Sequence, residues 1–151
     1  TGSEHAWFKT AVEYLKTLPE GAQPDPAACP YVEYYTFSTD ASAVKAPKEV
    51  TGTDWWYEAP FSYDMPDLNL DNPAVRQEVE AIMAYWMDKG VAGFRLDAAK
   101  EFYSGSIDKN VEVLNWIQTT AQSLKEDVYL RPDRPGKCHR GLPGRGADGV
   151  P

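Results

Sequence analysis

The stretch GFRLDAAKEF, residues 93–102, places two opposite charges two residues apart inside an otherwise apolar run. Side chains alternate between the two faces of a strand, so Arg95 and Asp97 share one face. A run of this length is typical of a strand buried on both faces in a parallel sheet. On such a strand we expect Arg95 to pair with Asp97 and to keep it ionised. The residues alone leave open whether this is a structural ion pair or a catalytic carboxylate with its partner.

The segments on either side of this run have helical periodicity. Asn72 as N-cap, with Pro73 at the first helical position, predicts a helix that ends at Gly90. Ser106 as N-cap predicts a second helix that reaches Leu124. The apolar side chains expected on the core faces are Val75, Val79, Ile82, Met83 and Trp86 in the first helix and Ile107, Val111, Leu114, Ile117, Ala121 and Leu124 in the second.

The order of these segments predicts an α/β fold. A strand over residues 91–98 lies between the two helices, and a short apolar strand begins at residues 128–130. Helix, strand, helix, strand with short links indicates parallel strands joined by right-handed crossovers. Residues 1–65 have few periodic segments and many Pro, Gly, Thr and aromatic residues, so we expect an irregular excursion packed against the regular part.

Composition narrows the classes of partner. The chain has 151 residues, 42% of them hydrophobic, which is enough for one domain-sized core. The formal net charge of −8 argues against nucleic acid and against anionic membrane surfaces as partners. Five Trp and nine Tyr supply flat rings that suit stacking on sugars and equally suit a core. Two Cys are too few for a disulfide framework, and the spacing of a metal site is missing.

The last 21 residues, 131–151, differ from the rest in composition. Nine of them are Gly or Pro, and five are Arg or Lys against two Asp. So little apolar surface cannot offset the entropy of ordering, so we expect this segment to be disordered. Two origins are open: a genuine flexible tail, or GC-rich DNA translated out of frame after Leu130.

A calcium-loop pattern must be weighed against helix capping. Positions 1, 3, 5 and 12 of a helix-loop-helix calcium loop would be filled by Asp67, Asn69, Asp71 and Glu78. Pro66 directly before the loop excludes an entering helix, and Pro73 stands at position 7. We therefore expect Asp71 and Asn72 to cap the following helix.

Three motifs resemble the alpha-amylase family of glycoside hydrolases, whose catalytic domain is a (β/α)8 TIM barrel. GFRLDAAK, residues 93–100, resembles the family segment at the end of the fourth barrel strand. MPDLN, residues 65–69, is similar to the segment that closes the domain inserted after the third strand. TGSEHAWF, residues 1–8, looks like the stretch that follows the third strand. The resemblance covers residues 1–130.

The resemblance implies a division of the chain into three parts. Residues 1–64 would be the inserted domain that follows the third barrel strand. Residues 65–130 would be the third helix, the fourth strand and helix, and the start of the fifth strand of the catalytic barrel. Residues 131–151 would be the disordered or out-of-frame tail. The expected fold class is therefore α/β, a fragment of a TIM barrel with its inserted domain.

The resemblance also implies roles for individual residues. Asp97 matches the family nucleophile, and Arg95 would orient it and keep it ionised. Lys100 stands at the family position that contacts sugar, although an exposed loop lysine is an equally simple interpretation. His5 matches a family position in the inserted domain, where we favour a structural, hydrogen-bonding histidine. Glu101 replaces the His of many relatives, and calcium is implied only as possible in a complete parent, so no metal ligand is assigned.

The general acid of the family is a Glu just after the fifth strand, and the sequence Arg131-Pro132-Asp133 stands there instead. Flanking prolines give Asp133 no rigid strand end that would position it. The resemblance thus predicts a fragment of a retaining hydrolase acting on an alpha-glucan or maltooligosaccharide substrate, inactive alone. The alternative is a non-catalytic relative that uses the same scaffold to bind carbohydrate or a partner.

Overall fold

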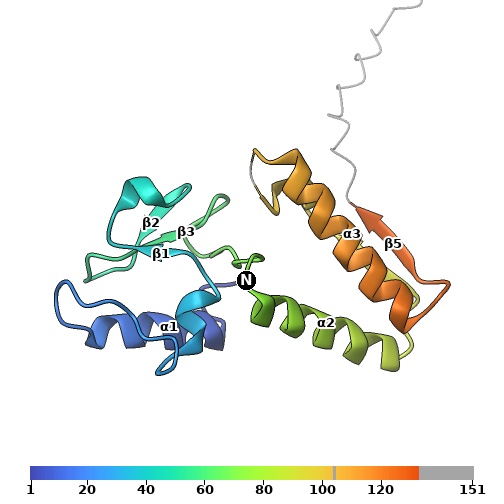
Figure 1. Cartoon of the computed structure of the whole chain (residues 1–151), viewed down its shortest axis with the longest axis horizontal. Helices are drawn as coiled ribbons and strands as arrows, with labels where there is room; N and C mark the ends of the chain where they lie inside the picture. The colour runs from blue at the N-terminus through green and yellow to red at the C-terminus, as the bar shows by residue number, and fades with distance from the viewer. Residues whose placement is uncertain (104, 133–151) are drawn as a thin grey trace, which may run out of the picture.

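The computed structural model describes residues 1–103 and 105–132, which form two lobes (Figure 1). The first lobe contains α1 (Ala6–Thr17), η1 (Pro30–Glu33), β1 (Phe37–Ser38), η2 (Ala41–Ala43), β2 (Pro47–Glu49) and β3 (Trp56–Glu58). The second lobe contains α2 (Pro73–Asp88), β4 (Gly93–Leu96), η3 (Ala99–Glu101), α3 (Ile107–Leu124) and β5 (Tyr129–Pro132). The N-terminus lies between the lobes (Figure 1).

The first lobe is more regular than its composition predicts. Its three short strands form an antiparallel sheet in the order β1-β3-β2. Helix α1, which the sequence analysis did not predict, buries Phe8, Ala11 and Leu15. These three residues recur at intervals of three and four, the spacing of one helix face. The same spacing includes Trp7 and Val12, so the signal was present in the sequence, and the Pro, Gly and aromatic content of residues 1–65 drew the prediction away from it.

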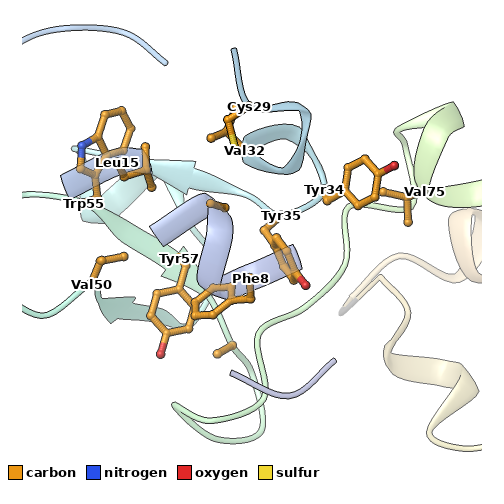
Figure 2. Close-up of a cluster of buried hydrophobic side chains, with 12 residues drawn as sticks. Phe8, Leu15, Cys29, Val32, Tyr34, Tyr35, Val50, Trp55, Tyr57 and Val75 are labelled. Carbon is orange, nitrogen blue, oxygen red and sulfur yellow. The ribbon is translucent and has the colours of Figure 1, made fainter. Parts of the chain in front are cut away.

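An aromatic core joins α1 to the sheet of the first lobe (Figure 2). The ring of Phe8 lies 5.1 Å from that of Tyr35 and 4.9 Å from that of Tyr57, both in edge-to-face geometry. Cys29 is buried in the same cluster and has a free thiol. Val75, in the first turn of α2, also belongs to this core, so the helix that begins the second lobe is anchored in the first.

Helices α2 and α3 begin where the sequence predicts. Asn72 caps α2, its side-chain oxygen accepting a hydrogen bond from the amide of Ala74 at 2.9 Å. Gly90 follows the end of α2 with a φ of 89°, a left-handed conformation that suits glycine. The side chain of Ser106 accepts from the amide of Lys109 at the start of α3. The N-cap and C-terminal glycine signals therefore located these boundaries correctly.

The predicted core faces of these helices are only partly right. In α2, Met83 is buried, but Ile82 and Trp86 are about half exposed. In α3 the buried positions are Val113, Ile117 and Ala121, whereas the predicted core residues Ile107, Val111 and Leu124 are exposed. Both helices are amphipathic as expected, but the elements packed against them bury only part of each predicted apolar face.

Strands β4 and β5 pair in parallel, as predicted, with Gly93 opposite Tyr129 and Leu96 opposite Pro132. The expectation of a strand buried on both faces is wrong. Phe94 and Leu96 pack into the second core with residues of α2 and α3, while Arg95 faces away and is exposed. The reason is that both helices pack on the face that carries Phe94 and Leu96.

The structure describes the first two residues of the C-terminal segment 131–151. Arg131 and Pro132 belong to β5, so the expectation of disorder from residue 131 is wrong for these two residues. Residues 133–151, which include Asp133, lie outside the described residues. Across residues 1–103 and 105–132, no helix is both long and apolar enough to span a membrane.

Candidate active site

Arg95 and Asp97 meet at the carboxyl end of β4. Asp97 lies one residue beyond the strand, and an Nη of Arg95 donates a hydrogen bond to its Oδ1 at 2.9 Å. The predicted ion pair is therefore confirmed. Its expected burial is not, because 63% of the Arg95 side chain and 78% of the Asp97 side chain are exposed. An exposed ion pair contributes little to stability. The cavity that Asp97 lines is a better reason for the position of this carboxylate.

Asp97 faces a cavity of about 270 Å³ between the two lobes. The first lobe and the chain that leaves it supply Thr1, Phe61, Met65, Pro66 and Asp67, and the segment after β4 supplies Asp97, Ala98, Glu101 and Phe102. The cavity thus combines apolar side chains with three carboxylates. Sugar sites have this character, because C–H faces pack on aromatic rings and hydroxyl groups bind carboxylates.

The sequence analysis did not predict that Phe61, Met65 and Asp67 line the cavity of Asp97. Asp67 and Met65 belong to the MPDLN motif, so the motif itself was the available signal. Phe61 lies four residues earlier, outside the motif, and its side chain is exposed. Its contact with the site depends on how the two lobes meet, which no local pattern encodes.

Burial controls the electrostatics of the cavity wall. Loss of solvent raises the pKa of Asp67, and the nearby ammonium group of Thr1 opposes this only in part. The neighbouring Glu58 also has a raised pKa, chiefly through burial and secondarily through repulsion by Asp67. Two carboxylates close together in a poorly solvated place cannot both ionise freely. A proton is therefore held more readily here than on the exposed carboxylates of the chain.

The chain turns sharply after Asp97. Ala98 adopts φ 45° and ψ 36°, in the left-handed region that a non-glycine residue rarely enters. The short helix η3 follows, and its first residue, Ala99, is buried. Tyr103 then leads into α3, and the side chain of Asn110 on α3 contacts this turn.

Lys100 is not brought into the cavity. Its side chain is 75% exposed and its Nζ lies 3.5 Å from the carboxylate of Glu101. It is also not among the residues that line the cavity of Asp97. Contact of Lys100 with a sugar therefore stays a prediction that depends on a bound substrate.

His5 has the structural role that the sequence analysis favoured. Its Nδ1 accepts a hydrogen bond from the amide of Trp7 at 3.3 Å and so caps α1. The ring centroids of His5 and Trp7 are 4.7 Å apart in edge-to-face geometry. The imidazole therefore contacts the first turn of α1.

The residues of the rejected calcium loop contact protein groups. The side-chain amide of Asn69 donates to the carbonyl of Glu33, and Asp71 accepts hydrogen bonds from Tyr103 and Lys109. Asp71 therefore does not cap α2, contrary to the prediction, because Tyr103 and Lys109 engage its carboxylate. Within residues 1–103 and 105–132, no three His, Cys, Asp or Glu side chains gather in a way that could hold a metal ion.

Comparison with known proteins identifies the family. Residues 1–129 match the model of the alpha-amylase catalytic domain. The chain belongs to the alpha-amylase family. Relatives include alpha-amylase 3 of Dictyoglomus thermophilum, 36% identical over 137 residues, and an oligo-1,6-glucosidase of Parageobacillus thermoglucosidasius, 35% identical over 109 residues. Both of these relatives carry the names of glycosidases.

The alpha-amylase relatives are much longer than this chain. The match covers 86% of the chain and 23% of the Dictyoglomus protein, and 64% of the chain and 17% of the Parageobacillus protein. Amy13B of Eubacterium rectale superimposes with a TM-score of 0.83 at 41% identity, over 87% of this chain and 25% of that structure. The solved neighbours also include an alpha-amylase from H. orenii, and the described residues form a mixed helix and strand portion of about a quarter of the length of both structures.

Proposed function

We propose that this chain is part of the catalytic domain of a retaining glycoside hydrolase that acts on alpha-glucans or alpha-glucosides, with Asp97 as the nucleophile. One observation carries the proposal: Asp97 stands at the carboxyl end of a parallel strand, is held by Arg95 at 2.9 Å and lines a cavity. Enzymes built on a TIM barrel place their catalytic groups at this end of the strands. The names of the relatives support the substrate class.

The proposed chemistry requires an ionised Asp97 aimed at the anomeric carbon. The carboxylate attacks that carbon, the glycosidic bond breaks, and a second carboxyl about 5–5.5 Å away protonates the leaving oxygen. Arg95 would keep Asp97 ionised and oriented, and Lys100 would bind a sugar hydroxyl. Phe61 and Met65 would form the apolar wall for the sugar ring.

The remaining proposals concern organisation. We assign residues 1–64 to the domain inserted after the third barrel strand. We assign residues 65–130 to the third helix, the fourth strand and helix, and the start of the fifth strand. The separation into an aromatic lobe and a parallel α/β lobe supports this boundary. The possible calcium of a complete parent finds no matching cluster among the described residues, so no step involves it.

The test uses a complete catalytic domain that contains these residues. Asp97→Asn keeps the shape of the side chain but makes a very poor nucleophile, so formation of the covalent glycosyl-enzyme from an activated glucoside should stop. In the chain of 151 residues, where this side chain is largely exposed, the same substitution should change the melting temperature little. Asp88→Asn, at an 81% exposed carboxylate at the end of α2, is the matched control and should retain turnover. Near-parental turnover by Asp97→Asn would end the nucleophile assignment.

A further inference from the structure

The turn after Asp97 needs support from outside itself. Ala98 holds a left-handed conformation that costs free energy for a residue with a Cβ, and such conformations persist only where surrounding contacts impose them. Within the turn, the amide of Glu101 donates to the carbonyl of Ala98 at 2.8 Å. This one bond closes the turn but does not fix its position relative to the rest of the lobe.

Asn110 supplies three hydrogen bonds to the backbone of this turn, in addition to the hydrogen bond from the Tyr103 hydroxyl to Asp71. The Oδ1 of Asn110 accepts a hydrogen bond from the amide of Tyr103 at 2.8 Å. Its Nδ2 donates to the carbonyl of Lys100 at 2.7 Å and to that of Tyr103 at 3.0 Å. One side chain thus satisfies three backbone groups on a turn that makes few regular backbone hydrogen bonds. Only a primary amide offers an acceptor and two donors in this arrangement.

The backbone of Asn110 is itself held rigidly. It lies in the second turn of α3, which Ser106 caps and which Val113 and Ile117 anchor in the second core. The preceding residue, Lys109, pairs with Asp71 at 2.8 Å, beside the start of α2. The amide of Asn110 therefore transmits the position of a packed helix to the turn that carries Asp97.

We infer that Asn110 is a positioning residue, which fixes the turn over residues 98–103 and thereby sets the direction of the Asp97 carboxylate toward the cavity. This role rests on the proposed function of Asp97. Attack on an anomeric carbon demands alignment within a fraction of an ångström, and misplacement by 1 Å can cost about 100-fold in rate. The ion pair with Arg95 alone does not supply that alignment, because both side chains are largely exposed.

The first measurement is amide hydrogen exchange on the chain of 151 residues. In Asn110→Ala, the amides of Tyr103 and Glu101 should exchange faster by about tenfold or more, because the first loses its acceptor and the second lies in a loosened turn. Ser106→Ala is the matched control. It removes the cap of the same helix and should speed exchange at Lys109 while leaving Glu101 unchanged. Parental exchange at both Tyr103 and Glu101 in Asn110→Ala would overturn the inference.

The second measurement is catalysis by the complete domain. Asn110→Asp retains the acceptor for the Tyr103 amide and loses both donors, so the rate of glycosyl-enzyme formation should fall by about tenfold or more with KM within about twofold. Ser106→Ala should keep the parental rate at a comparable loss of melting temperature. Equal rates in the two variants would overturn the positioning role alone. Near-parental turnover by Asp97→Asn would instead overturn the proposed function, and the positioning role with it.

Discussion

At the scale of single residues, two aspartates four positions apart have opposite acid–base behaviour. Burial raises the pKa of Asp67. Hydrogen bonds from Lys109 and then from Tyr103 lower the pKa of Asp71. The partners of Asp71 lie 38 and 32 residues further along the chain. The direction of each pKa shift depends on neighbours that are distant in the sequence, so it could not be predicted from local pattern. For the same reason, the prediction that Asp71 caps α2 was wrong.

These directions predict opposite pH dependence for two matched substitutions. A raised pKa means that folded Asp67 binds a proton more tightly than the unfolded chain does, so ionisation costs stability above that pKa. Asp67→Asn should therefore raise the free energy of unfolding at pH 7, with the gain vanishing as the pH falls below the unfolded pKa. For Asp71 the pKa is lowered, so its contribution is present above the unfolded pKa and is lost as the pH falls through the folded pKa.

Asp71→Asn should accordingly lower stability at pH 7, by about 0.5 kcal/mol as for exposed ion pairs, and this effect should shrink as the pH falls through the folded pKa of Asp71. Urea unfolding of both variants and the parent between pH 2 and pH 7 measures the two curves. Curves for the two variants that shift in the same direction at pH 7 would contradict the assigned environments.

At the scale of elements, the sequence predicted boundaries better than faces. Side-chain capping and glycine act within a few residues, which is why Asn72, Gly90 and Ser106 located α2 and α3 correctly. The buried edge of each helix depends instead on the neighbour that covers it, so Ile107 and Val111 were wrongly assigned to the core. The parallel pairing of β4 with β5 followed from the order of elements alone.

Gly93 is the position where the pairing of β4 with β5 is most sensitive to a side chain. A Cβ at this residue would collide with the backbone carbonyl of Tyr129, its partner in the ladder. Gly93→Ala should therefore destabilise the chain by about 1–3 kcal/mol, the range for forced overpacking. Gly2→Ala, where nothing lies within 4 Å of the added atom, is the control. Thermal unfolding of both variants checks this, and a melting temperature for Gly93→Ala equal to that of Gly2→Ala would contradict it.

At the scale of the whole molecule, two hydrophobic cores share α2 as a common element. Val75 in its first turn belongs to the aromatic core, Met83 near its end belongs to the second core, and Leu70 just before it packs against both. The candidate cavity lies between the lobes, so the residues that line it depend on how the two lobes pack together. For this reason the motif containing Asp97 was found from the sequence, while the contribution of Phe61 was not.

The proposed function makes a prediction for the isolated chain. It spans about a quarter of the length of its relatives, whereas glycoside hydrolysis needs a nucleophile and a general acid together. The chain of 151 residues should therefore not hydrolyse maltooligosaccharides measurably. Reducing-sugar release over hours, compared with the Asp97→Asn chain as a blank, is the measurement. Release that exceeds the blank would show that the chain carries a complete catalytic set.

The buried thiol of Cys29 allows transient opening of the aromatic lobe to be measured by chemical labelling. Only 4% of this residue is accessible, so a maleimide can alkylate it only during transient opening of the core that also contains Val32 and Tyr35. Mass mapping separates the adduct on Cys29 from any on Cys138. The labelling rate as a function of urea then gives the opening free energy of the lobe that contains Cys29.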